Sequence, residues 1–266
     1  MQKITKQYIL FTYLAFFLFI LCIGFVMLKI KNNKIVEMMK IMSSWTPNLI
    51  FLVMFKKIYP HDSRTSFIIR QFASRLKLKA LLAAFALPFF VFLGSMIALS
   101  IWSQKPLWEL LDLSPSFLLL AIPSHLIRGP LGEELGWRGF LFQEYRKKHS
   151  IIKTGMLVGL IWGFWHFPLW LVSGLSAIDL VIYILSFLVS IVCCSIMIGL
   201  VYSYAKNIVI PVMMHMLNNY FLGLFTCDII PVLICFAVFY SLVTIVLVCL
   251  HKKKQCAHLL TNPVRN

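Results

Sequence analysis

Charged residues are scarce in this chain: 13% of its 266 residues are Asp, Glu, Lys or Arg, whereas 61% are hydrophobic. A soluble domain averages about 25% charged residues, so this composition excludes an ordinary soluble domain. Acidic residues are rarer still, with 9 Asp and Glu against 25 Lys and Arg. In a soluble protein this excess of positive charge would suggest nucleic acid. Here the basic residues cluster between hydrophobic runs, which indicates topological signals and contacts with membrane lipid, and no nucleic acid partner.

Several sequence signatures are also absent. The seven cysteines show no C-x-x-C spacing and lie mostly within apolar runs, so neither a disulfide framework nor a zinc cluster is indicated. The chain has no H-E-x-x-H motif, no internal repeat and no low-complexity segment. No small-residue cleavage site follows the first apolar run, at about 8–28. We therefore expect that run to be a membrane anchor rather than a removable signal peptide.

The long apolar runs predict an all-α fold, a polytopic membrane bundle of about eight transmembrane helices. They place the spans at about 8–28, 41–55, 80–102, 115–142, 154–173, 178–202, 207–225 and 229–250. The second span is short and contains Pro47. The fourth is expected to be kinked or restarted at Gly129-Pro130, because proline interrupts a helix.

The distribution of basic residues predicts the orientation of this bundle. With eight spans, the stretch 56–79, the loop 143–153, Lys206 and the tail from His251 all fall on one side. The positive-inside rule makes that side cytoplasmic, so both termini are predicted to be cytoplasmic. The connection 29–40 is an exception, because it carries four lysines and one glutamate and falls outside. The abundance of Lys, Phe and Ile suggests a bacterial source and therefore the bacterial plasma membrane.

The fourth predicted span contains ionisable residues at membrane depth. Such residues cost about 2.5–3.5 kcal/mol each on insertion scales and indicate function by default. Glu134 and Arg138 are four residues apart, acid first, which favours an ion pair. We expect this pair to be structural and to orient Glu133. Glu133 points about 100° away from it; we expect it to lack a partner in its own helix and to be available for chemistry.

Two other predicted spans contribute polar residues at a similar depth. His166 follows Trp162 by one turn in the fifth span, and His215 and Asn219 share one helix face in the seventh. At 1.5 Å rise per residue, Glu133, His166 and His215 lie roughly 12–18 Å below the predicted cytoplasmic face. A common depth is what a single site requires.

Further residues near these positions have weaker predictions. His125 and Arg128 precede the turn at Gly129-Pro130 and are plausible lining or gating residues. Asn218 points away from the His215 face and is expected to bond to backbone or a neighbouring helix. The tryptophans of the fifth span are expected to be packing and interface residues.

Three polar motifs, each on its own predicted span, follow one another in the chain: Glu133-Glu134-x-x-x-Arg138, Trp162-x-x-x-His166 and His215-x-x-x-Asn219. With the surrounding Gly-Pro-Leu-Gly-Glu-Glu-Leu-Gly-Trp-Arg-Gly, they resemble the CPBP family of CAAX-protease and bacteriocin-processing intramembrane proteases, also called the Abi family. Trp162 stands where that family often has Phe. The resemblance covers roughly 115–225 and divides the chain into spans one to three with a basic cytoplasmic loop (1–114), a catalytic core (115–225), and the last span with a basic tail (226–266).

The resemblance implies hydrolysis of a peptide bond within or at the membrane. It implies Glu133 as the general base for water, His166 to hold and activate that water, and His215 with Asn219 to stabilise the oxyanion. Alternatively, Glu133, His166 and His215 would ligate Zn²⁺, since they are the right ligand types and number for a catalytic zinc. Both alternatives stay open, because a glutamate that ligates a metal cannot freely act as the base.

The leading hypothesis is an intramembrane endopeptidase that acts on a peptide or a membrane-anchored protein. In bacteria the resemblance implies bacteriocin maturation, self-immunity or the processing of signalling peptides. A second hypothesis is a non-catalytic membrane immunity or regulatory protein that binds a partner through the same scaffold. A third is a small transporter, although the sequence lacks the paired halves with matching broken helices that transporters often show.

Overall fold

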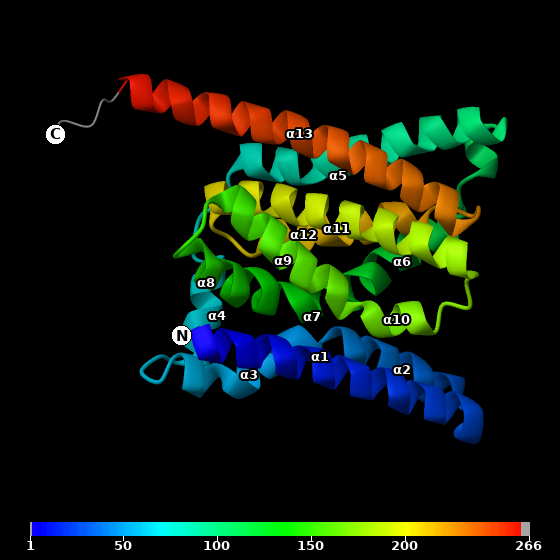
Figure 1. Ribbon diagram of the computed structural model, residues 1–266, viewed down its shortest axis with the longest axis horizontal. Helices are drawn as coiled ribbons and strands as arrows, with labels where there is room; N and C mark the ends of the chain where they lie inside the picture. Colours follow the sequence, from blue (N-terminus) through cyan, green and yellow to red (C-terminus); the bar gives the residue numbers. More distant parts are fainter. Residues whose placement is uncertain (1, 262–266) are drawn as a thin grey trace.

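The computed structural model describes residues 2–261, with side chains for residues 2–255, and the fold is all-α as predicted (Figure 1). Residues 262–266 of the predicted tail lie outside the described residues. The helices are, in chain order, α1 (Gln2–Phe25), η1 (Val26–Ile30), α2 (Asn33–Ser44), α3 (Thr46–Ile58), α4 (Arg64–Phe72), α5 (Leu78–Ser103), η2 (Leu107–Glu109), α6 (Pro115–Ile127), α7 (Pro130–Glu134), η3 (Leu135–Phe142), α8 (Gln143–Arg146), α9 (Ile151–Trp165), α10 (Phe167–Leu171), α11 (Ala177–Ala205), α12 (Val209–Gly223) and α13 (Ile229–Thr261).

The number of long apolar helices is smaller than the predicted eight. Within residues 2–261, five helices are long and apolar enough to cross a membrane, or up to six if α2 and α3, bent by 53°, form one broken span. Each of the eight predicted spans is covered by one, two or three helices. However, the fourth is divided into α6, α7 and η3, and the seventh is the 15-residue α12. The predicted fold class is confirmed, and the predicted count is not.

The helices run back and forth along one axis (Figure 1). One layer contains α1, α2 and α3, the opposite layer contains α5 and α13, and α7, α9, α11 and α12 lie between them. The start of α1 and the end of α13 lie at the same end of the bundle, together with α4 and α8. The start of α1 and the end of α13 therefore share a side, and the assignment of that side to the cytoplasm stays a prediction.

Three helix breaks surround the centre of the bundle, and a proline follows each of them. Pro47 stands in the first turn of α3, Pro130 begins α7, and Pro168 stands in the first turn of α10. Proline is tolerated in the first turn of a helix because its missing N–H would have no intrahelical partner there. The predicted interruption at Gly129-Pro130 is confirmed, since α6 ends at Ile127 and α7 starts at Pro130.

Glycines bring α9 and α11 into close contact. Gly155 and Gly159 are four residues apart on α9, and a Cβ on either would lie 2.7–2.8 Å from a Cα atom of α11. Small residues at this spacing let membrane helices pack backbone to backbone. The close approach fixes the position of the C-terminal end of α9, which carries Trp162 and leads to His166.

Candidate active site

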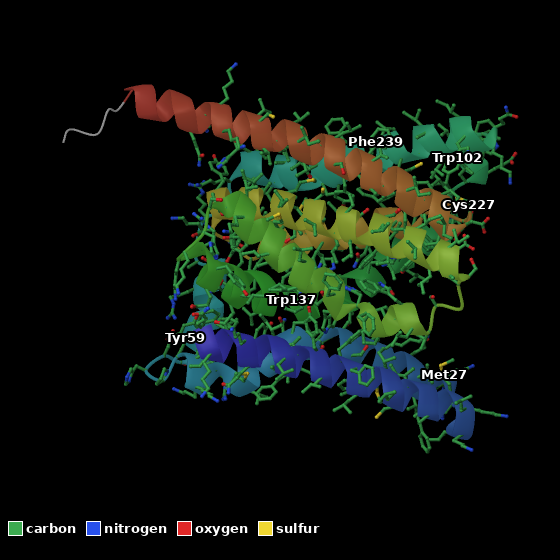
Figure 2. The ribbon with its side chains drawn as sticks, viewed as in Figure 1. Met27, Tyr59, Trp102, Trp137, Cys227 and Phe239 are labelled. Carbon is green, nitrogen blue, oxygen red and sulfur yellow. The ribbon has the colours of Figure 1, made fainter. Side chains whose placement is uncertain are left out.

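Glu133 is buried at the centre of the bundle and is held by two indole rings. Its Oε2 accepts a hydrogen bond from Nε1 of Trp137 at 3.2 Å and from Nε1 of Trp162 at 2.7 Å. Figure 2 labels Trp137 in this central region. These contacts correct two expectations, because Glu133 does have a partner in its own helical segment and Trp162 is more than a packing residue. The indoles can only donate, so they fix one carboxylate oxygen and leave Oε1 available.

Glu134 is fully buried and contacts two nitrogen-bearing side chains. Its Oε1 accepts from Nη1 of Arg138 at 2.8 Å and lies 2.8 Å from Nδ1 of His215. The Glu134–Arg138 pair therefore forms as predicted, whereas the link to His215, 81 residues away in the chain, does not follow from the sequence. The Arg138 guanidinium also lies over the Trp162 ring, 4.5 Å from its centroid. The pair thus orients His215 as well as its own helix.

The position of His166 depends on the break between α9 and α10. It ends α9, and its Nδ1 lies 2.9 Å from the carbonyl oxygen of Trp162. Because a carbonyl can only accept, Nδ1 of His166 must carry the hydrogen, and a neutral ring then has a free lone pair on Nε2. The ring also packs edge-on against Trp165 and Phe187.

A short polar chain between helices orients Asn219. Tyr240 of α13 donates its hydroxyl hydrogen to Oδ1 of Asn218 at 2.5 Å, and Nδ2 of Asn218 donates to Oδ1 of Asn219 at 3.0 Å. Asn218 thus bonds to a neighbouring helix, as expected, and also to the adjacent Asn219. Because the amide oxygen of Asn219 accepts that bond, its Nδ2 remains available as a donor. Tyr240 gave no signal in the sequence, since it lies in an apolar helix outside the three motifs.

The available atoms of three of these residues converge on Gly129. A Cβ placed on Gly129 would lie 3.2 Å from Oε1 of Glu133, 3.3 Å from Nδ2 of Asn219 and 3.5 Å from Nε2 of His215. The absence of a side chain at Gly129 therefore leaves open the point that all three groups face. Glu133, His166, His215 and Asn219 also line one cavity of about 140 Å³. The structure thus brings together the four residues that the sequence placed at similar depth.

Helix α3 holds the broken segment that carries Glu133. Nδ2 of Asn48 donates to the carbonyl of Leu131 at 2.7 Å, and its Oδ1 accepts from the backbone N–H of Gly136 at 2.7 Å. Nε1 of Trp45 donates to the carbonyl of Ile127 at 2.9 Å. In a membrane, backbone groups freed at a helix break need such internal partners. The π-helix η3, a form frequent at functional sites, is thereby supported from a segment that the sequence did not connect to the site.

The two weaker lining candidates have different positions. Arg128 lines the cavity beside Glu133, as expected. His125 instead packs edge-on against Tyr220, and its Nε2 would lie 2.8 Å from a Cβ on Gly223. It is not among the residues that line the cavity.

The zinc ligands suggested by the sequence were Glu133, His166 and His215. Among the described residues, no group of three or more His, Cys, Asp or Glu side chains is arranged to hold a metal ion. The ring of Trp162 packs 4.6 Å from that of His215 and 6.4 Å from that of His166, and its N–H holds Glu133. The three side chains share a cavity but do not fit a zinc site, and we derive no reaction step through a metal.

The fold and the cavity define a polytopic helical membrane protein with a buried glutamate, two histidines and an asparagine around one space. Residues 115–221 match the family model described as "Type II CAAX prenyl endopeptidase Rce1-like". This match confirms the resemblance to the CPBP family over that part of the chain.

A relative from Methanococcus maripaludis, named CAAX prenyl protease 2, is 34% identical over 92 residues. The matched segment spans 33% of this chain and 34% of the relative's length. The likeness therefore concerns about a third of each protein.

Proposed function

We propose that this chain is an intramembrane endopeptidase that hydrolyses a peptide bond of a membrane-associated peptide or protein. The observation that supports this most is the convergence of Oε1 of Glu133, Nε2 of His215 and Nδ2 of Asn219 on the space beside Gly129. Hydrolysis of an amide needs a base for water and donors for the carbonyl oxygen. Oε1 of Glu133 can act as the base, and Nε2 of His215 and Nδ2 of Asn219 are nitrogens of the types that serve as such donors. The family match and the name of the M. maripaludis relative support the same reaction class.

In the proposed reaction, a water molecule in the cavity gives a proton to Oε1 of Glu133 and attacks the carbonyl carbon of the substrate. The two indole N–H groups on Oε2 keep the carboxylate oriented during this transfer. Nε2 of His166 accepts a hydrogen bond from the same water and helps to place it. The protonated Glu133 then gives its proton to the leaving amine as the C–N bond breaks.

The developing oxyanion is stabilised by Asn219 and His215. Nδ2 of Asn219 donates directly, because its oxygen is engaged by Asn218. Nδ1 of His215 lies against the carboxylate of Glu134 and its Nε2 faces the cavity, so His215 donates to the oxyanion when Nε2 carries a hydrogen. Glu134 and Arg138 are therefore positioning residues that act through His215. Donors fixed before the reaction stabilise the transition state without reorganisation.

The test compares membrane and secreted peptides from cells that express the wild type, Glu133→Gln or the control Glu144→Gln. Gln is nearly isosteric and can still accept the indole hydrogen bonds, but it cannot act as the base. Glu144 pairs with Lys147 away from the cavity. We expect specific fragments to fall by about 10²–10⁴-fold in Glu133→Gln, the range typical for loss of a general base, and to persist in Glu144→Gln.

Two outcomes would contradict this proposal. Identical peptide profiles, with a cellular phenotype that persists in Glu133→Gln, would support the non-catalytic immunity or regulatory function. Loss of cleavage by the purified protein with 1,10-phenanthroline, restored by Zn²⁺, would show that a metal, and not Glu133 alone, activates the water. The identity of the cleaved fragments would show whether the protein acts in bacteriocin maturation, in self-immunity or on signalling peptides.

A further inference from the structure

A second and larger cavity adjoins the catalytic one. It has a volume of about 540 Å³ and lies between α1, α2 and α10, within the roughly 300–1,000 Å³ typical of ligand sites. Phe16, Ile20 and Ile23 of α1 face Leu169 and Val172 across it. Of these five side chains, only Phe16 and Ile23 are buried. We call this cavity the α1–α10 groove.

The α1–α10 groove leads directly to the proposed catalytic residues. Arg128, Glu133 and His166 line both cavities. At its other extremity the groove reaches Met27, which Figure 2 labels at the end of the bundle opposite Tyr59. The groove therefore opens toward the end that lies away from both termini.

Positive charge lines this route and gathers beyond its mouth. Lys40 and Arg128 line the groove and share one counterion, Glu37, at 2.9 Å and 2.8 Å. Immediately after Met27, the turn that leads from η1 into the first residues of α2 carries further basic side chains, all exposed: Lys29, Lys31 and Lys34. Apart from Glu37, the acidic residues at this end lie in or next to other connections: Glu109, Asp112, Asp179 and Asp228.

These lysines are the exception to the charge pattern that orients the chain. Basic residues that act as topological signals gather at the predicted cytoplasmic end, where α4 and α8 lie. Lysines at the opposite end need a different role, and their position at the mouth of a groove that ends at Glu133 suggests contact with the substrate. An extended peptide fits this route better than a lipid chain, because hydrolysis requires a peptide backbone beside Glu133.

We propose that the α1–α10 groove binds an extended substrate segment whose apolar residues pack against α1 and α10 and whose acidic residues meet the turn carrying Lys29, Lys31 and Lys34. This inference rests on the proposed function. The path along α1 from Phe16 to Met27 is about 16 Å at 1.5 Å per residue. An extended chain covers about 3.3 Å per residue. The groove therefore takes about five extended residues, and the acidic positions should lie beyond them, at least about five residues from the bond that is cleaved, on the side of the membrane opposite the termini.

The test uses the full-length protein in phosphatidylcholine vesicles and two matched peptide libraries. Both libraries contain an apolar stretch that is otherwise randomised; beyond it, one carries Asp and Glu and the other Asn and Gln. Products are sequenced by mass spectrometry. We expect the acidic peptides to have a kcat/KM about 10-fold higher, a difference that added salt reduces, as for steering by exposed charge.

The matched variants are the triple substitution Lys29→Gln, Lys31→Gln, Lys34→Gln and the control Lys252→Gln, Lys253→Gln, Lys254→Gln at the other end of the bundle. The first should remove the preference for acidic peptides while cleavage of the amide peptides continues, and the second should leave the preference unchanged.

Four results would contradict the inference or its basis, and they can be told apart. Equal cleavage of both libraries by the wild type, or a preference that survives the first triple substitution, overturns the groove assignment and leaves the protease function standing. A lysine effect seen only in vesicles with phosphatidylglycerol assigns the lysines to lipid and also overturns it. Wild-type cleavage no greater than that of Glu133→Gln means that the proposed function itself fails.

Discussion

Two adjacent carboxylates in α7 have different tasks because their partners differ. Glu134 binds Arg138 and His215 through one oxygen and is completely buried. Glu133 has one oxygen held by neutral indole donors, which leave its charge uncompensated, and the other faces the cavity. Oε1 of Glu134 is engaged by two side chains, whereas Oε1 of Glu133 faces the cavity, where it can take a proton from water. This difference in partners is why Glu133, and not its neighbour, is proposed as the base.

At the residue scale, Gly129→Ala tests whether the reacting bond lies at the point of convergence. The added methyl would stand 3.2–3.5 Å from Glu133, Asn219 and His215, where it displaces the water and the carbonyl. We expect peptide cleavage to fall by about 100-fold, the effect of a misplacement near 1 Å, with little loss of folded protein. Fragment yields and thermal unfolding in detergent measure the two effects.

Gly139→Ala is the matched control for that substitution. Its new methyl would meet the side chain of Leu135 at 3.1 Å, a similar crowding, but outside the catalytic cavity. Wild-type cleavage by Gly129→Ala would show that the bond is not cleaved beside Gly129.

At the scale of elements, the sequence predicts contacts that are local or carried by the polar motifs. The spacing of Glu134 and Arg138 predicts their pair, and the common depth of Glu133 and His215 predicts that they meet. The hydrogen bonds of Glu133 to the indoles do not follow from spacing, because they depend on how the rings pack. The contact of Asn48 with Gly136 joins residues 88 apart, and nothing in a single sequence indicates such a pairing.

The role of α3 as a clamp on the broken segment predicts a stability effect at Asn48. Asn48→Ala leaves the carbonyl of Leu131 and the N–H of Gly136 without their partner in the bundle interior. An unsatisfied buried polar group costs about 1–3 kcal/mol. We expect a lower unfolding temperature in detergent and a loss of cleavage, because α7 and η3 position Glu133. The adjacent Leu49→Ala, whose side chain is exposed on the surface of the bundle, should change neither; equal effects of the two substitutions would argue against the clamp.

At the scale of the whole molecule, the interruptions of the helices lie around the site. The breaks before α3, α7 and α10 each place a residue that the site uses: Trp45, Gly129 and His166. Irregular backbone at membrane depth is tolerated where it is buried in protein or lines a cavity. Helices α5 and α13 form the layer opposite α1, α2 and α3, α11 lies in the layer between them, and all three of these long helices are continuous. The same interruptions divide the apolar runs into shorter helices. The sequence therefore suggests eight spans, whereas only five or six helices of the described residues are long enough to cross a membrane.

Whether α12 crosses the membrane decides the orientation of the whole chain. Its 15 residues span about 22 Å, less than the roughly 30 Å hydrocarbon core, but it runs antiparallel to both α11 and α13 (Figure 1). Its far end is joined to the α5–α6 connection by two backbone hydrogen bonds, Asp112 to Leu224 and Thr226 to Leu110. We therefore expect fusions of alkaline phosphatase to be active after residue 226 and inactive after residues 206 and 255, with green fluorescent protein showing the opposite pattern. Equal phosphatase activity after residues 206 and 226, with the opposite result after residue 255, would mean that α12 does not cross and would remove the basis for placing both termini in the cytoplasm.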